Sequence, residues 1–260
     1  MQVMTGENGE ITLSGRITPF EDVVYCLCMN IQVDLNEAYL YMGGKGKPEK
    51  EDLRMLKEAS SLILDTVSLR TIDRFSETEK TDKGISLKGT SIVLSGKAAG
   101  NLLKDCSSCM VFCVTIGQEA ETLIRKWEVK DIAFAAALDV CASAAVESLC
   151  ELEEKSIAQK YAKGRGKNGA DLFLTDRFSP GYEDMPLSLQ KDLCGFLDTG
   201  RKIGVLLSES ALMIPRKSVT AILGLSEKEQ KHRDTGCAFC PSFPSCNFRK
   251  NGVTCYGHIL

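Results

Sequence analysis

Residues 177–182 read RFSPGY, between an apolar run and a segment with helical spacing. Pro180 and Gly181 suit the two central positions of a type II turn, because proline fixes the first backbone angle and glycine accepts the positive φ required next. The turn therefore holds Arg177 and Tyr182 close together. A guanidinium group matches a carboxylate or a phosphate, and a tyrosine adds a hydroxyl and a stacking face. The stretch indicates either an ordinary loop with an exposed arginine or the centre of an anion-binding site.

A long core helix is expected before this turn, from about residue 129 to residue 162. No glycine or proline interrupts it, and the Gly-Arg-Gly sequence at residues 164–166 ends it. Asp139 and Glu147 are the only charges between residues 132 and 150. Because an unpaired buried carboxylate is costly, each must reach solvent, a partner or a ligand. They are either ordinary acids at the edge of the core or ligand contacts.

The remaining segments mix strands and helices. Apolar spacing indicates a helix around residues 36–40 and an amphipathic helix from about residue 48 to residue 67. Residues of the β type indicate strands at 11–13, 23–28, 85–88 and 92–94, and a buried strand at 109–117. Cys106 and Cys109 sit at the entrance of the buried strand, so we assign them to packing.

The composition is that of a globular chain. With 43% hydrophobic residues, 260 residues can bury a substantial core. Thirty-two basic against 35 acidic residues give a net charge of -3, which argues against nucleic acid or an anionic membrane as a partner. The N-terminus lacks a secretory signal, so we expect a cytoplasmic protein. Its 12 cysteines are then expected to be free thiols or metal ligands.

A second motif lies near the C-terminus, after a charged segment at residues 227–234. Its spacing is Cys-x2-Cys-x5-Cys-x8-Cys, formed by Cys237, Cys240, Cys246 and Cys255. Four thiolates suit one metal centre, and both tetrahedral zinc and a [4Fe-4S] cluster accept four cysteines. A zinc ribbon usually pairs two Cys-x2-Cys knuckles, whereas this tail has one. We expect residues 227–260 to form a hinge and a small metal-binding appendage.

Residues 131–226 resemble the activation domain of cobalamin-dependent methionine synthase. The RFSPGY turn is followed at the family's spacing by an amphipathic helix and by the sequence IGVLLSES at residues 203–210. The single residues that continue the pattern are Pro186, Leu189, Leu193, Phe196, Met213, Pro215, Ser218 and Val219. The resemblance implies an α+β fold, a twisted antiparallel sheet flanked by helices, that spans residues 1–226. It also implies a free-standing reactivation subunit.

That family binds S-adenosylmethionine and uses it to rescue oxidised cobalamin. A pocket for this ligand needs a cation for its carboxylate, an anion for its ammonium group and hydrogen-bonding backbone. Arg177, Glu147 and the turn supply one of each type. The resemblance therefore implies these contacts: Glu147, Arg177, Ser179, Pro180, Gly181 and Tyr182, with Asp139 and Glu209 as further candidates.

The reaction implied is reductive methylation of cob(II)alamin held by a partner, the methionine synthase or its cobalamin-binding module. Reduced cobalt is itself the nucleophile, so this chain needs no catalytic acid or base and acts by positioning. An electron-donor protein is a second expected partner, and this need for electrons favours iron–sulfur over zinc in the tail. We expect a docking groove lined by Tyr182, the turn before it and residues 213–218. The family's aromatic segment after the Ser-Val motif is replaced here by the charged residues 227–234.

Two other interpretations stay open. The chain could be a reductive activator of another corrinoid-dependent methyltransferase, with the tail as electron carrier. It could also be a metal-stabilised adaptor that keeps the fold without binding the ligand. Thermal stabilisation by S-adenosylmethionine separates the adaptor from the two enzyme components, and co-purification with a methyltransferase separates those two from each other.

Overall fold

The computed structural model describes residues 31–44, 47–230 and 250, together with the backbone of three short N-terminal strands. Those strands are β1 (Gln2–Thr5), β2 (Ile11–Ser14) and β3 (Val23–Cys26). β1 pairs only with β2, whereas β3 pairs with β4 of the main sheet. The four cysteines of the tail lie outside the described residues.

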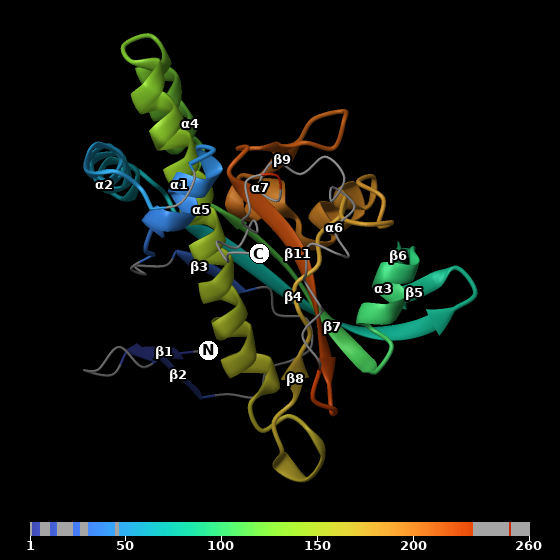
Figure 1. The fold of residues 1–260 in the computed structure, drawn as a ribbon. Helices are drawn as coiled ribbons and strands as arrows, with labels where there is room; N and C mark the ends of the chain where they lie inside the picture. The colour runs from blue at the N-terminus through green and yellow to red at the C-terminus, as the bar shows by residue number, and fades with distance from the viewer. Residues whose placement is uncertain are drawn as a thin grey trace.

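A seven-stranded antiparallel sheet forms the centre of the molecule, in the order β6-β5-β4-β7-β11-β8 with β3 beside β4 (Figure 1). Two long strands carry most of the pairing, because β4 and β11 both pair with β7 over most of its length. The strands are β4 (Arg70–Thr81), β5 (Gly84–Leu87), β6 (Val93–Leu94), β7 (Cys106–Thr115), β8 (Phe173–Leu174) and β11 (Ser218–Ser226). The expected antiparallel sheet is confirmed.

Alternation along β7 divides the apolar residues between two cores. Phe112 and Val114 face α5 on one side of the sheet, whereas Val111 and Cys113 face α6 on the other. Figure 1 shows α1, α2, α4 and α5 on the first side and α3, α6 and α7 on the second. The helices are α1 (Leu35–Tyr41), α2 (Lys50–Leu64), α3 (Lys97–Leu102), α4 (Gln118–Glu128), α5 (Ile132–Ile157), α6 (Leu189–Leu197) and α7 (Thr199–Ile203).

The long helix α5 confirms the predicted core helix. Asp131 caps its N-terminus by accepting hydrogen bonds from the backbone N–H groups of Ala133 and Phe134, at 3.0 and 3.1 Å. At its C-terminal end α5 continues into a π-helical turn, η1 (Ala158–Ala162). The helix is long and apolar enough to cross a membrane, but more than half of its most apolar stretch is buried inside the protein. Packing in the core accounts for that composition.

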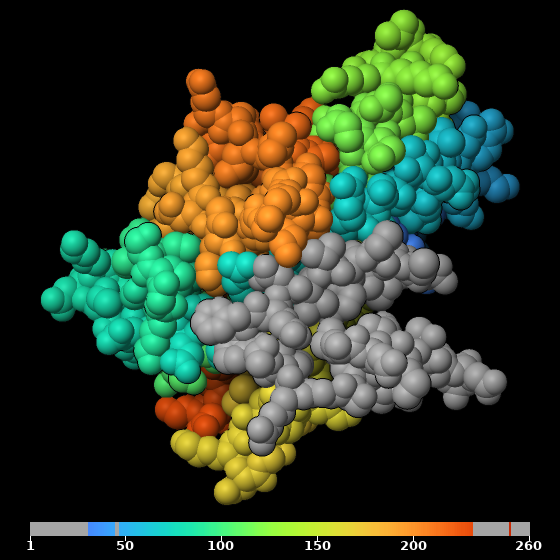
Figure 2. Space-filling model, turned by 180° about the vertical axis from the view of Figure 1, so that it is seen from behind, coloured from blue at the N-terminus to red at the C-terminus, as the bar shows by residue number. Residues whose placement is uncertain are grey.

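Shorter elements project from this framework. Seen from behind, the segment from β5 to α3 forms a lobe at one side, and the tip of α4 stands out at another corner (Figure 2). β9 (Leu206–Leu207) and β10 (Met213–Ile214) form a separate hairpin that exposes Leu206, Leu212 and Ile214. A short 3₁₀ turn, η2 (Lys167–Gly169), follows η1.

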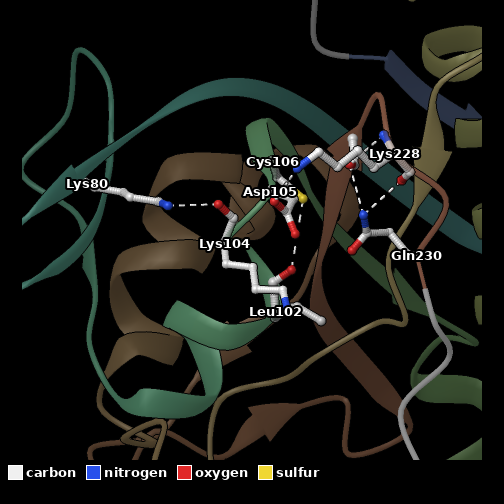
Figure 3. Close-up of polar contacts among 8 residues, drawn as sticks. Lys80, Leu102, Lys104, Asp105, Cys106, Lys228 and Gln230 are labelled. Atoms are coloured by element: carbon white, nitrogen blue, oxygen red, sulfur yellow. Dashed lines mark hydrogen bonds and ion pairs between the residues drawn. The ribbon is translucent and has the colours of Figure 1, made fainter.

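Polar contacts hold the end of β11 beside the start of β7 (Figure 3). Lys228 Nζ lies 3.1 Å from Asp105 Oδ1, and the side chain of Gln230 donates to the Ser226 hydroxyl at 2.8 Å. Lys80 of β4 donates to the backbone carbonyl of Lys104 at 2.7 Å. The described chain therefore reaches residue 230 at a fixed point, next to the α3–β7 connection.

Candidate functional site

The RFSPGY stretch forms the predicted tight turn. The Tyr182 backbone N–H donates to the Ser179 carbonyl at 3.3 Å, and Gly181 has φ 89°. That backbone angle is in the region that favours glycine, as a type II turn requires. Pro180 is buried and Tyr182 is 67% exposed, so the turn presents its aromatic side chain to solvent.

The two residues before the turn face opposite sides of the sheet. Phe178 pairs by its backbone with Ile222 of β11, and its ring is buried in the core beneath α6. Arg177 consequently points to the other side, where α5 lies. The backbone pairing to β11 thus fixes the direction in which the guanidinium group leaves the chain.

Arg177 lies between two glutamates of α5. Its Nη1 donates to Glu154 Oε1 at 2.5 Å, and its Nη2 donates to Glu147 Oε2. Because Glu147 and Glu154 are seven residues apart, they share one face of the helix, two turns from each other. The three side chains keep 29 to 35% of their surface exposed. We call Glu147, Arg177 and Glu154 the arginine cluster.

Burial raises the pKa of the Glu147 carboxyl, and the neighbouring acids Glu37, Glu154 and Glu151 raise it further, against the opposing effect of Arg177. Removal of the cation would therefore make this carboxylate harder to keep ionised. Burial also raises the pKa of the adjacent Cys150 thiol, so Cys150 is not an activated nucleophile.

Asp184 ties the turn to the lobe formed by β5, β6 and α3. Its two carboxylate oxygens accept hydrogen bonds from the backbone N–H groups of Lys97 and Ala98, at 2.6 and 3.1 Å. These bonds hold the pKa of Asp184 below its usual range. The turn is thus attached at one end to β11 and at the other to α3.

A second polar cluster lies inside the protein at β4. We call its two acids, Asp73 of β4 and Glu153 of α5, the buried acid pair. Asp73 accepts hydrogen bonds from Lys160 Nζ at 3.2 Å and from the Tyr161 hydroxyl at 3.0 Å. The π-helical turn allows these two consecutive residues to reach one carboxylate. Glu153 is fully buried beside Asp73, and its oxygens have no hydrogen-bond partner within the described residues. Burial, together with Asp73, raises the pKa of Glu153 to about 8, against the opposing effect of Lys160.

Neither acid of this pair was predicted as a functional or buried residue. The sequence Glu151-Leu152-Glu153-Glu154-Lys155 reads as the solvated end of a helix, and only the contact with β4 buries Glu153. Glu154 was missed for the same reason. Its spacing of seven residues from Glu147 was the one signal available.

The structure unites some of the predicted site residues and not others. Glu147 and Arg177 are in direct contact, and residues 179–182 follow them in the turn. Asp139 instead pairs with Lys217 at 2.9 Å, in a pocket of about 340 Å³ that also includes Arg125 and Arg216. Glu209 is exposed in the tip of the β9–β10 hairpin. Roles in ligand binding stay predictions for all of these residues.

Metal binding by the tail also stays a prediction, because all four cysteines lie outside the described residues. Within residues 31–44 and 47–230, no group of three or more metal-ligating side chains comes together. Cys109 is buried and Cys106 is half-buried, and burial raises their pKa values to about 12 and about 11. These two thiols pack in the sheet, as expected.

Residues 99–234, just over half of the chain, match the model of the family described as "Vitamin B12 dependent methionine synthase, activation domain". Among solved structures, the fold is similar to "Crystal Structure of the MetH Reactivation Domain bound to AdoHcy", with a TM-score of 0.61. The two sequences are 17% identical, and the likeness covers 82% of this chain and 80% of that chain. No curated protein matches the sequence.

Proposed function

We propose, from the premise that the chain belongs to the family of vitamin B12 dependent methionine synthase activation domains, that it is a reactivation subunit. It binds S-adenosylmethionine and presents the methyl group to cobalamin on a partner methionine synthase. The observation that supports this most directly is the arginine cluster beside the RFSPGY turn. A cation and an anion lie in contact there, at a partly exposed position.

The cluster has the chemistry to receive an amino acid. Arg177 uses two N–H donors in its contacts with the glutamates, and a guanidinium group has others to offer a ligand carboxylate. Glu147 is the acceptor for the ligand ammonium group. The exposed Tyr182 adds a stacking face next to the same turn. Together these groups would hold the methionine part of the ligand and leave its sulfonium toward the partner.

This chain contributes binding and orientation. Cobalamin on the partner supplies the reduced metal nucleophile that accepts the methyl group. The residues that would face it are Tyr182 and the strand-to-strand segment from Met213 to Ser218, where Ile214 is exposed. Attack by such a nucleophile needs alignment, to which a rigid turn contributes. Exclusion of water would fall to the docked partner, because Tyr182 and Ile214 are exposed in this chain.

The tail is proposed to carry one [4Fe-4S] cluster on Cys237, Cys240, Cys246 and Cys255, with zinc as the alternative. A cluster held by these cysteines would supply electron transfer, and an electron-donor protein is then the expected second partner. Cys246→Ser is then expected to impair reactivation with a protein donor but not with a small strong reductant. Equal loss with both donors, or stoichiometric zinc after anaerobic purification, contradicts the redox role.

Calorimetry on Arg177→Ala tests the proposed ligand site. A charge-assisted bidentate contact is worth about 1.5 to 3 kcal/mol, so affinity for S-adenosylmethionine should fall at least about tenfold. Glu147→Gln should lose less, because the amide keeps an acceptor oxygen. Arg201→Ala is the matched control, since Arg201 is exposed on α7 and pairs only with Asp198 among the described residues. Unchanged affinity in a folded Arg177→Ala protein would exclude the carboxylate contact.

A further inference from the structure

Two ion-paired clusters lie along α5 and η1, and they differ in access. In the buried acid pair, Asp73 is fully buried and Lys160 keeps 9% of its side chain exposed. In the arginine cluster about a third of each side chain is exposed. A ligand can therefore reach Arg177, whereas the Asp73–Lys160 pair is closed to a ligand from solvent.

The arginine cluster also contains one more carboxylate than it has cations. One cation is shared by two carboxylates, which reach it from positions two helical turns apart on the same face. The α-carboxylate and α-ammonium groups of an amino acid are attached to one carbon. Such a ligand fits between a cation and an anion that already touch, with its carboxylate on Arg177 and its ammonium on Glu147. The direct contact between Arg177 and Glu147 must then open.

We propose that Glu154 is a positioning residue that keeps the Arg177 guanidinium in place while Glu147 exchanges Arg177 for the ligand ammonium. Glu154 touches only Arg177 in this scheme and makes no contact with the ligand. Its bond to Nη1 persists in both states, so the guanidinium does not have to be ordered anew when the ligand enters. This inference rests on the proposed function, and it divides the two glutamates into separate roles.

The roles predict different responses to two ligands. S-adenosylmethionine carries both the carboxylate and the ammonium group, whereas decarboxylated S-adenosylmethionine has the ammonium group and no carboxylate to place on Arg177. Glu154→Gln should weaken binding of S-adenosylmethionine by roughly three- to tenfold and change binding of the decarboxylated ligand by less than about twofold. Glu147→Gln should weaken both ligands. A general loss of structure would weaken binding of both ligands. Weaker binding of S-adenosylmethionine alone is therefore specific to a positioning role.

Calorimetric titration of both ligands into the full chain provides the test. Glu128→Gln is the control, because Glu128 is an exposed glutamate on α4 that has no bond to Arg177. Equal weakening of both ligands by Glu154→Gln, or no weakening of either, overturns the inference. Failure of the proposed function is a separate result: the wild-type protein would then bind neither ligand.

Discussion

The buried acid pair should make the stability of this protein fall as the pH rises through neutrality. The carboxyl of Glu153 has an ordinary pKa of 4.5, and in the folded protein its pKa is about 8. Between these values the folded state holds a proton that the unfolded state has lost, so stability is fully present below pH 4.5 and decreases as the pH rises toward 8. The slope approaches ~1.4 kcal/mol per pH unit, which amounts to roughly 2 kcal/mol between pH 6 and pH 8.

Glu153→Gln removes this titration and leaves a neutral group of similar shape. Urea unfolding at pH 6, 7 and 8, followed by circular dichroism, gives the free energy of unfolding of both proteins. The comparison uses slopes, because the buried amide brings a constant cost of its own. Glu128→Gln serves as control, since Glu128 is exposed on α4. If the wild-type and Glu153→Gln curves run parallel across this range, Glu153 is not protonated in the folded state and the reasoning fails.

Three other substitutions test the framework by urea unfolding. Gly224→Ala should cost about 1–3 kcal/mol, because an added Cβ would lie 2.5 Å from Cys106 Sγ; an unchanged midpoint would contradict the close packing. Asp131→Ala should cost about 1 kcal/mol through loss of the α5 cap, and no loss would show that the cap is dispensable. Lys160→Met should cost about 3–5 kcal/mol by leaving Asp73 buried without its cation, whereas an unchanged midpoint would show that the Lys160 ion pair does not contribute to stability.

Features that depend on a short stretch of the chain could be predicted from the sequence. The uninterrupted run of small and apolar residues predicted α5, and the Pro-Gly pair predicted the turn, because each depends on neighbours within a few residues. The antiparallel sheet was expected partly from the family resemblance. Its register brings residues together across long separations, such as Ser218 and Thr115, and no local pattern encodes such pairs.

The candidate site was half predictable. Arg177 stood out because of the turn, and Glu147 because it is an isolated charge in an apolar helix. Glu153 and Glu154 did not, since adjacent glutamates near a helix end usually face solvent. Their environments come from β4 and from the segment before the turn, which are distant in sequence. Asp139 was a reasonable candidate by composition, but its partner is Lys217, the residue just before β11.

The opposite orientations of Arg177 and Phe178 have a consequence for how this segment can change during evolution. A single inserted or deleted residue between β8 and the turn would exchange the two faces, placing the guanidinium group in the apolar core and the ring against the glutamates of α5. Length changes should therefore be excluded from residues 174–178 in relatives of this chain. The loop at residues 163–172, which is mostly exposed and pairs with no strand of the sheet, is where such changes can accumulate.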